Sequence, residues 1–182
     1  MKLSISKDAL LQALQKVQNV VAARSTLPVL SNVMISAEKT GVTLTTTDLD
    51  VSMRCRTDAA VQKAGSTTLP VRRLSGIVRE LPESDILMEV GEDNIAALEC
   101  NSSYFKINGI ASEEFPPMPN PEGNRVFEMD QGAFREMLRK TAYSASTDET
   151  RYMLNGVLLS FRGGKLTMVA TDGRRLALGE HA

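Results

Sequence analysis

The sequence predicts an α+β fold built from repeats of one unit, a strand followed by a helix and three further strands. The first observation is an internal repeat, in which residues 4–53 align without a gap on residues 128–177 at an offset of 124 residues. Identical pairs include Asp48 with Asp172. The second observation is that helical and strand-like hydrophobic periodicities follow each other in the same order within each repeat. The chain is therefore expected to grow by adding copies of one folding unit.

The first repeat occupies the N-terminal third of the chain. Residues 2–6 alternate between apolar and polar, as in a half-buried strand, and Ser6 is suited to cap the helix expected over residues 7–20. Apolar residues recur along that helix at the spacing of one buried face. Three strands are expected to follow, over residues 30–37, 41–46 and 49–56.

A second copy of the pattern begins near Ser66. It comprises a strand that ends at Pro70, a helix over residues 71–81, and strands over residues 86–90, 95–100 and 104–110. The third copy starts at Val126. Its helix is expected over residues 130–142, and its strands over residues 152–161, 165–170 and 175–179.

Four prolines between residues 116 and 121 separate the second copy from the third. Because neither a helix nor a central strand tolerates such a run, this segment is interpreted as a linker between domains. The expected organisation is a first domain of two repeats over residues 1–120, a linker over residues 121–125, and half of a second domain over residues 126–182. The unpaired half-domain should expose an apolar face.

Composition excludes several classes of function. The chain has 182 residues, and no segment is apolar for long enough to cross a bilayer, so a cytoplasmic location is expected. Cys55 and Cys100 lack metal-binding spacing and are interpreted as reduced thiols. His181 is the single histidine, which argues against imidazole-based triads and histidine-rich zinc sites. We expect no catalytic site, no metal and no cofactor, so the chain is not expected to be an enzyme.

The net charge of −1 conceals an uneven distribution. The three expected helices carry eight basic and four acidic residues, whereas the rest of the chain is net negative. Positive charge is therefore concentrated on helices, where it can meet a polyanion.

The most informative motif is a Thr-Asp pair repeated at the same place in two copies. Thr47-Asp48 and Thr171-Asp172 are expected to close turns between strands through the Asp side chain. In the third copy the pair continues as Gly173-Arg174-Arg175-Leu176-Ala177, which contains more than a turn requires.

This motif resembles the Thr-Asp-Gly-His-Arg-Leu-Ala signature of the bacterial DNA polymerase III beta subunit family, the sliding clamps. Four further stretches agree with the family, at residues 26–32, 46–50, 79–82 and 151–156. The resemblance extends over the whole chain, which is similar to the N-terminal half of such a subunit. It implies the DNA-clamp fold and a ring-shaped homodimer of three-domain subunits around duplex DNA, with helices inside and sheets outside.

The resemblance also assigns residues to two interfaces. Met153 stands where relatives often have a second aromatic residue, and Arg174 stands where His is commoner. The family's DNA contacts map onto Arg24, Arg72, Arg73, Arg79 and Tyr152. The family's peptide-binding pocket maps onto Leu154, Thr171, Gly173, Arg174, Arg175 and Leu176. The rest of that pocket lies in family sequence beyond Ala182, so this chain alone should bind such a peptide weakly or not at all.

Two functions from different classes remain open at this stage. The first is a non-catalytic processivity factor that binds duplex and primed DNA. By resemblance, its partners are the polymerase III alpha subunit, the clamp loader, and other polymerases and repair proteins that bind through short linear peptides, with no membrane involved. The second is a clamp-like peptide-binding adaptor that does not encircle DNA. A steep loss of affinity with salt would distinguish the first from the second.

Overall fold

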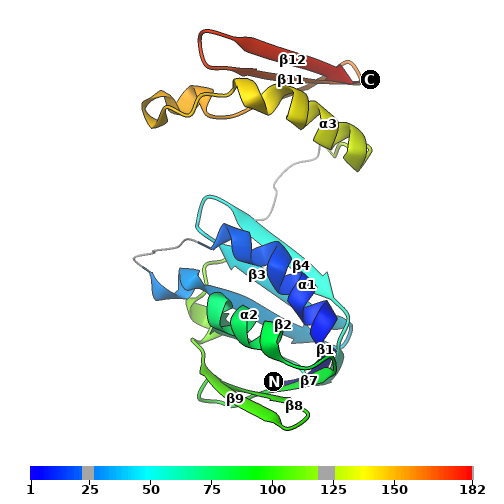
Figure 1. The fold of residues 1–182 in the computed structure, drawn as a ribbon, viewed down its shortest axis with the longest axis vertical. Coiled ribbons are helices and arrows are strands. Elements are labelled where there is room, and N and C mark those ends of the chain that lie inside the picture. The colour runs from blue at the N-terminus through cyan, green and yellow to red at the C-terminus, as the bar shows by residue number, and fades with distance from the viewer. Residues whose placement is uncertain (22–26, 119–125, 182) are drawn as a thin grey trace. The chain divides into compact units, whose positions relative to one another are not determined.

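A computed structural model of the chain describes residues 1–21, 27–118 and 126–181. The chain divides into two compact units, Met1–Asn120 and Pro121–Ala182 (Figure 1). Each unit is described by itself. No helix in the described parts of the chain has the length and apolarity that a membrane crossing requires.

The first unit combines two α-helices with nine strands. Its elements in chain order are β1 (Lys2–Ser6), α1 (Lys7–Val17), η1 (Gln18–Val20), η2 (Pro28–Ser31), β2 (Asn32–Glu38), β3 (Gly41–Thr47), β4 (Ser52–Thr57), β5 (Ala60–Lys63), β6 (Gly65–Pro70), α2 (Val71–Glu80), β7 (Asp85–Val90), β8 (Ile95–Cys100), β9 (Ser103–Asn108) and η3 (Ser112–Glu114). The elements labelled η are 3₁₀ helices. The predicted α+β class is confirmed.

Two antiparallel sheets form the first unit, with strand orders β5-β1-β7-β8-β9 and β4-β3-β2-β6. Each repeat sends its first strand into the sheet of the other repeat. Strand β1 pairs with β7, whereas β6, which leads into α2, pairs with β2. The two repeats are therefore joined by an exchange of strands.

The helices α1 and α2 lie side by side against these sheets (Figure 1). Ser6 caps α1 as predicted, since its hydroxyl accepts a hydrogen bond from the backbone N–H of Ala9 at 3.3 Å. The core side of the helix pair is apolar and sealed: Leu14 of α1 and Leu74 of α2 have no exposed surface. These side chains share one hydrophobic cluster with residues of both sheets, so burial on one face fixes each helix to the strands.

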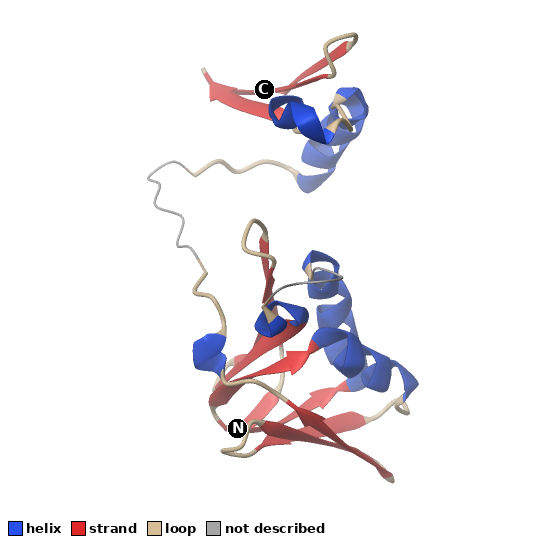
Figure 2. Cartoon of the chain, turned by 90° about the vertical axis from the view of Figure 1, so that its left-hand side faces the viewer, coloured by secondary structure: helices blue, strands red, loops and turns tan. Residues whose placement is uncertain are grey.

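The described part of the second unit has one α-helix and one sheet, which Figure 2 draws with its 3₁₀ helices. Its elements are α3 (Gln131–Thr141), η4 (Ala142–Ser144), η5 (Glu149–Leu154), β10 (Leu158–Arg162), β11 (Lys165–Thr171) and β12 (Leu176–His181). The sheet is antiparallel in the order β10-β11-β12. Four of these elements have the bounds of α1, η1, β3 and β4 shifted by the repeat offset of 124 residues, so the sequence repeat is also a structural repeat.

Several element boundaries were predicted wrongly. The strand expected from residue 30 starts at Asn32, because Pro28 begins a 3₁₀ helix that contains Leu30. The strand expected from residue 152 starts at Leu158, after η5. The strand expected from residue 49 starts at Ser52, and α1 ends at Val17 with η1 continuing it. Edge strand β5 was not predicted, since its exposed sequence Ala-Val-Gln-Lys shows no clear alternation.

The third repeat also lacks the short strand with which the pattern begins. Residues 126–130 have no strand conformation, although the equivalent residues 2–6 form β1. Strand β1 is held by hydrogen bonds to β5 and β7, and no described strand of the second unit pairs with residues 126–130. A strand without a neighbour leaves its backbone groups unpaired, which explains the difference.

The Thr-Asp pairs close both turns as predicted, and they do so with the same hydrogen bonds. Oδ1 of Asp48 accepts hydrogen bonds from the backbone N–H groups of Asp50 and Val51. In the second turn, Oδ1 of Asp172 accepts from the backbone N–H groups of Arg174 and Arg175. The hydroxyl of Thr47 donates to the carbonyl of Val51, and the hydroxyl of Thr171 makes the equivalent bond. The first and third repeats therefore share this turn and its hydrogen bonds.

One position of this turn requires a left-handed backbone. Leu49 has φ of 83°, and Gly173 at the equivalent position has φ of 86°. A left-handed conformation costs a residue with a Cβ atom roughly 1–2 kcal/mol, whereas glycine adopts it readily. Leu49 is 61% exposed, so little packing compensates for this cost.

We therefore expect Leu49→Gly to raise the free energy of unfolding of the first unit by about 0.5–1 kcal/mol, once the greater flexibility of unfolded glycine is subtracted. Urea denaturation, with amide hydrogen exchange to separate the two units, measures the change. The reverse substitution, Gly173→Leu, should destabilise the second unit. Equal unfolding midpoints for Leu49→Gly and the parent chain would show that Leu49 stores no strain.

Candidate nucleic-acid and peptide interfaces

The first candidate interface is the exposed face of α2. Arg72, Arg73 and Arg79 are all exposed, whereas Leu74 and Val78 of the same helix are completely buried. Burial of one side of a helix directs the remaining positions toward solvent. The three predicted DNA-contacting arginines of α2 are thus brought together on one solvent-facing surface, which we call the α2 basic face.

The arginines of the α2 basic face form no ion pair with any residue that the structure describes. Some other helical cations do have a carboxylate partner. Nζ of Lys7 lies 2.6 Å from a carboxylate oxygen of Glu83. In α3, one carboxylate is shared, because Arg139 and Lys140 lie 2.9 and 3.4 Å from Oε1 of Glu136. All three arginines of α2 are therefore without a described carboxylate partner, whereas two of the three cations of α3 share one carboxylate.

Helix α1 extends this surface. Lys16 is exposed on α1, and the two helices are linked where the hydroxyl of Ser75 donates to Oε1 of Gln18 at 3.2 Å. Gly76 lies on the exposed side of α2, and a Cβ atom added there would meet nothing within 4 Å. Packing does not require a glycine at this place. Because Gly76 has no side chain, the helix backbone between the arginines stays uncovered.

The second candidate interface is the turn between β11 and β12. Asp172 organises this turn: its Oδ1 accepts from the N–H groups of Arg174 and Arg175 at 2.9 Å each, and its Oδ2 lies 3.0 Å from Nε of Arg175. The guanidinium of Arg175 also lies over the ring of Tyr143, 5.9 Å from its centre. The Arg175 side chain is therefore held in place, while Arg174 is exposed and makes no described side-chain bond.

These contacts change the acidity of Asp172. The backbone N–H of Arg175, then that of Arg174 and the charge of the Arg175 side chain, hold the pKa of the Asp172 carboxyl below its usual value. Hydrogen bonds from Thr150, first from its hydroxyl and then from its backbone, lower the pKa of Asp148 in the same way. Both carboxylates therefore stay ionised and available to the neighbouring arginines.

An open pocket of about 360 Å³ adjoins this turn. It brings Arg174 and Arg175 together with Asp148 and Arg151, two residues that the sequence analysis did not select. Asp148 could have been found from its sequence, because Asp is a preferred N-cap residue, and Asp148 caps η5 by accepting from the backbone N–H of Thr150. The pocket is lined by Ala145, Ser146, Thr147, Asp148, Arg151, Asp172, Arg174 and Arg175.

The remaining selected residues lie apart from this pocket lining. Tyr152 and Met153 of η5 are 77% and 80% exposed. Leu154 ends η5 and is half-buried, and Leu176 at the start of β12 is 62% exposed. Arg24, the fifth predicted DNA contact, lies outside the described residues.

Comparison with known families identifies the fold. Residues 1–119 match the model of the DNA polymerase III beta subunit, N-terminal domain, and residues 128–182 match that of its central domain. The chain belongs to the DNA polymerase III beta subunit family. The resemblance inferred from the Thr-Asp-Gly motif is confirmed.

Individual beta subunits support this membership. The chain is 38% identical over 177 residues to the beta sliding clamp of Chlamydia muridarum, covering 97% of this chain and 48% of the relative. It is 37% identical over 182 residues to that of Pseudomonas aeruginosa, covering 98% of this chain and 49% of the relative. The chain thus spans about half the length of the curated relatives it matches.

Solved beta subunit structures share the fold. The sliding clamp of Bacillus subtilis matches all of this chain, and half of its own, with a TM-score of 0.95 and 30% identity. A Pseudomonas aeruginosa clamp bound to griselimycin matches all of this chain and 49% of its own, with a TM-score of 0.94 and 36% identity. The DNA-clamp fold predicted for the chain is confirmed.

The acidity of Asp172 gives a prediction about pH. Because the folded pKa lies below the unfolded value of about 4, stabilisation of the turn is complete above that value and declines as the pH falls through the folded pKa. We expect the amide resonances of Arg174 and Arg175 to stay constant from about pH 7 to about pH 5 and to shift only in stronger acid. NMR titration measures this.

The matched variant is Asp172→Asn, whose side-chain oxygen can accept the two backbone N–H bonds without titrating, although the bond from Nε of Arg175 to Oδ2 is lost. Its two amide resonances should show no such acid shift. An unchanged acid shift in Asp172→Asn would assign the transition to another group.

Proposed function

We propose that this chain is part of a DNA sliding clamp, the non-catalytic processivity factor of a replicative DNA polymerase in the cytoplasm. The observation that carries the proposal is the α2 basic face, whose three arginines lack carboxylate partners among the described residues, in a chain of the beta subunit family. Unpaired guanidinium groups on a helix surface suit a polyanion. The proposal assigns Arg72, Arg73 and Arg79 to the phosphate backbone of duplex DNA.

Contacts of this kind explain sliding. A guanidinium bound to phosphate positions a protein on DNA without reading bases, so every register along the duplex has nearly the same energy. Retention then comes from topology, through a homodimeric ring that encloses the duplex. In this ring, residues 1–120 form the first domain of the subunit and residues 126–182 the first half of the second. Division into two compact units supports this assignment.

Tyr152 is proposed as a further DNA contact, and its exposure of 77% supports this role. A largely exposed ring offers a stacking surface to a base of primed DNA. Met153 beside it is also exposed and presents a polarisable thioether instead of a second ring. Arg24 is assigned to the same interface by resemblance alone.

The turn between β11 and β12 is proposed as one wall of a docking site for short linear peptides of polymerases, the clamp loader and repair proteins. Its residues are Leu154, Thr171, Gly173, Arg174, Arg175 and Leu176. Two neighbouring residues support this role. The exposed side chain of Leu176 offers an apolar surface to a peptide, and the guanidinium of Arg175, held by Asp172, offers hydrogen-bond donors beside it. The unpaired charge of Arg174 favours peptides that bring an acidic or carbonyl group to this place.

The DNA assignment is tested by charge reversal. We expect the double substitution Arg72→Glu with Arg73→Glu to lower affinity for a fluorescent duplex at least tenfold, and to reduce the slope of log affinity against log salt by about two, because two phosphate contacts are lost. Fluorescence anisotropy over a salt series measures both quantities.

Lys106→Glu is the matched control. Lys106 is exposed on β9 and, since its neighbour Ile107 is buried, lies on the face of the sheet turned away from the core. Its reversal makes a single charge change far from α2 in the sequence and should leave the slope nearly unchanged. A loss in Lys106→Glu about half as large as in the double variant would indicate a general charge effect, because the control changes half as much charge. Salt-independent binding of peptides with no duplex binding at all would favour the adaptor function instead.

A further inference from the structure

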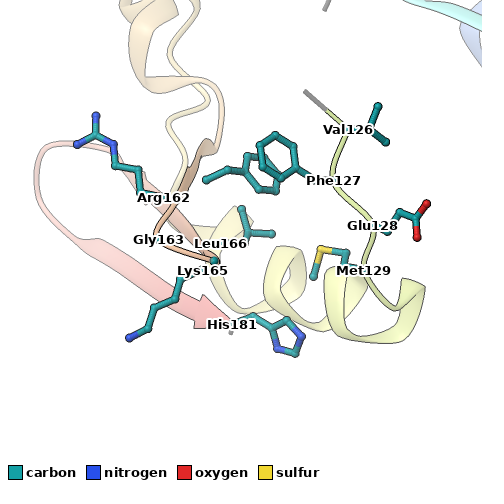
Figure 3. A pocket seen from close by; sticks show the side chains of 11 residues that line it. Val126, Phe127, Glu128, Met129, Arg162, Gly163, Lys165, Leu166 and His181 are labelled. Atoms are coloured by element: carbon teal, nitrogen blue, oxygen red, sulfur yellow. The ribbon is translucent and has the colours of Figure 1, made fainter. Parts of the chain in front are cut away.

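Two pockets in the described part of the second unit have walls of different kinds. The first, of about 380 Å³, has the apolar side chains of Phe127, Met129 and Leu166 around it (Figure 3). The second, of about 360 Å³, adjoins the turn between β11 and β12 and is bordered by charged side chains. One of its walls is the segment of residues 145–151, so the polar contacts of this segment decide the shape of the pocket.

This segment is part of a closed loop. The backbone N–H of Ser146 donates to the carbonyl of Leu154 at 2.9 Å, which joins the two ends of the loop. Inside the loop, Asp148 caps η5 by accepting from the backbone N–H of Thr150 at 3.0 Å. The backbone then leaves the helical conformation at Arg151, which has φ of −108° and ψ of 53°. The regular hydrogen bonds of a helix are interrupted at this kink, so another donor is needed to hold it.

Asn155, the residue that follows η5, supplies that donor. Three backbone carbonyl oxygens lie around one end of its side-chain amide, which identifies this end as the nitrogen, since an amide oxygen cannot donate. Nδ2 lies 3.1 Å from the carbonyl oxygens of Ser146 and Asp148, and 3.3 Å from that of Arg151. One side chain thus ties the beginning of the loop, the cap of η5 and the kink together.

The kink directs Arg151 to the neighbouring turn. Nη1 of Arg151 lies 3.6 Å from the place that a Cβ atom would take at Gly173, so its guanidinium lies against the Thr-Asp-Gly turn. Nε of the same group is 3.7 Å from Oδ2 of Asp148. Arg174 and Arg175 border the same pocket. Three arginines and two aspartates therefore line it, and its net charge is positive.

We propose that Asn155 is a positioning residue of the peptide-docking site, and that it acts by holding the kink that places Arg151 against Gly173. This role rests on the docking function proposed above for the turn. With Arg151 in place, the pocket receives an acidic side chain of the peptide between the guanidinium groups of Arg151 and Arg174, and an apolar neighbour of that side chain meets Leu176. Asn155 itself makes no contact with the peptide.

The position of Arg151 can be tested without any peptide. Asn155→Ala removes the donor, so the nuclear Overhauser contacts between the Arg151 side chain and the α-protons of Gly173 should disappear, while the amide resonances of α3 and β11 stay in place. Asn155→Asp keeps the shape but has no donor at neutral pH, and should give the same loss. Unchanged contacts between Arg151 and Gly173 in both variants would overturn the proposal.

Gln131→Ala is the matched control for these variants. It also removes a carboxamide from the second unit, but Gln131 is exposed at the start of α3 and makes no hydrogen bond through its side chain among the described residues. The contacts between Arg151 and Gly173 should therefore remain. Their loss in Gln131→Ala as well would show that they report general loosening of the unit, and would overturn the assignment to Asn155.

The effect on docking is measured with the capped dipeptide acetyl-Asp-Leu amide, which carries one carboxylate and one apolar side chain. Titration followed by NMR detects weak binding, and the probe should shift the Nε–Hε resonance of Arg151 in the parent chain. Asn155→Ala and Arg151→Ala should each raise the Kd about tenfold, which corresponds to the loss of one hydrogen bond to a charged group.

The double variant decides whether Asn155 acts through Arg151. Asn155→Ala combined with Arg151→Ala should bind the probe no more weakly than Arg151→Ala alone, because the residue to be positioned is already gone. Additive losses would show that Asn155 acts by another route, and would overturn the proposal.

The two measurements also separate this role from docking itself. No probe binding by the parent chain, with the Arg151 contacts still lost in Asn155→Ala, would refute the docking function while supporting the positioning of Arg151. Equal probe affinity in Asn155→Ala and the parent would refute the positioning role while supporting docking.

Discussion

The structure depends on one constraint, that a strand must have a neighbour to satisfy its backbone hydrogen bonds. In the first unit the constraint is met between repeats rather than within them, since β1 and β6 each belong to one repeat and pair in the sheet of the other. This exchange brings the two helices together on the sheets and closes a core in which Leu14 and Leu74 are fully buried. A single repeat cannot achieve this, and residues 126–130 show the result, an apolar segment without strand structure.

The same arrangement determines where charge can collect. Because α1 and α2 use one side for the core, their solvent sides form a continuous surface on which arginines have no required partner. The described ion pairs lie elsewhere: Glu83 follows α2 and pairs with Lys7 at the start of α1, and Glu136 pairs with Arg139 and Lys140 on α3. The exposure of three unpaired arginines on α2 therefore results from the packing of the helix together with the placement of these ion pairs. Overall net charge, at −1, gives no sign of it.

Much of this organisation could be predicted from the sequence. The helix and two of the strands of the second unit were predicted to within two residues of their observed bounds, because the alternation and the Thr-Asp turn are encoded locally. Boundaries that depend on distant partners were missed: residues 126–130 match β1 in pattern, but no local signal reveals that their partner strands are missing from the described structure. Likewise, η5 reads as part of a strand because Tyr152 and Leu154 favour strands. The pairing of Arg175 with Tyr143 needed coordinates, since the two residues come from elements far apart in the sequence.

The Thr-Asp turn has a consequence for how such a chain diversifies. Its bonds run from one Thr and one Asp to the backbone of the following residues, so the same hydrogen bonds form with different side chains at those residues. One repeat places Leu49 and Asp50 there, and the other places Gly173 and Arg174. A duplicated unit can thus acquire an acidic loop in one copy and a basic loop in another without altering its fold. The Thr and the Asp keep the shape of the turn, and the residues between the strands set its charge. One repeated segment can therefore form surfaces of different charge in the same molecule.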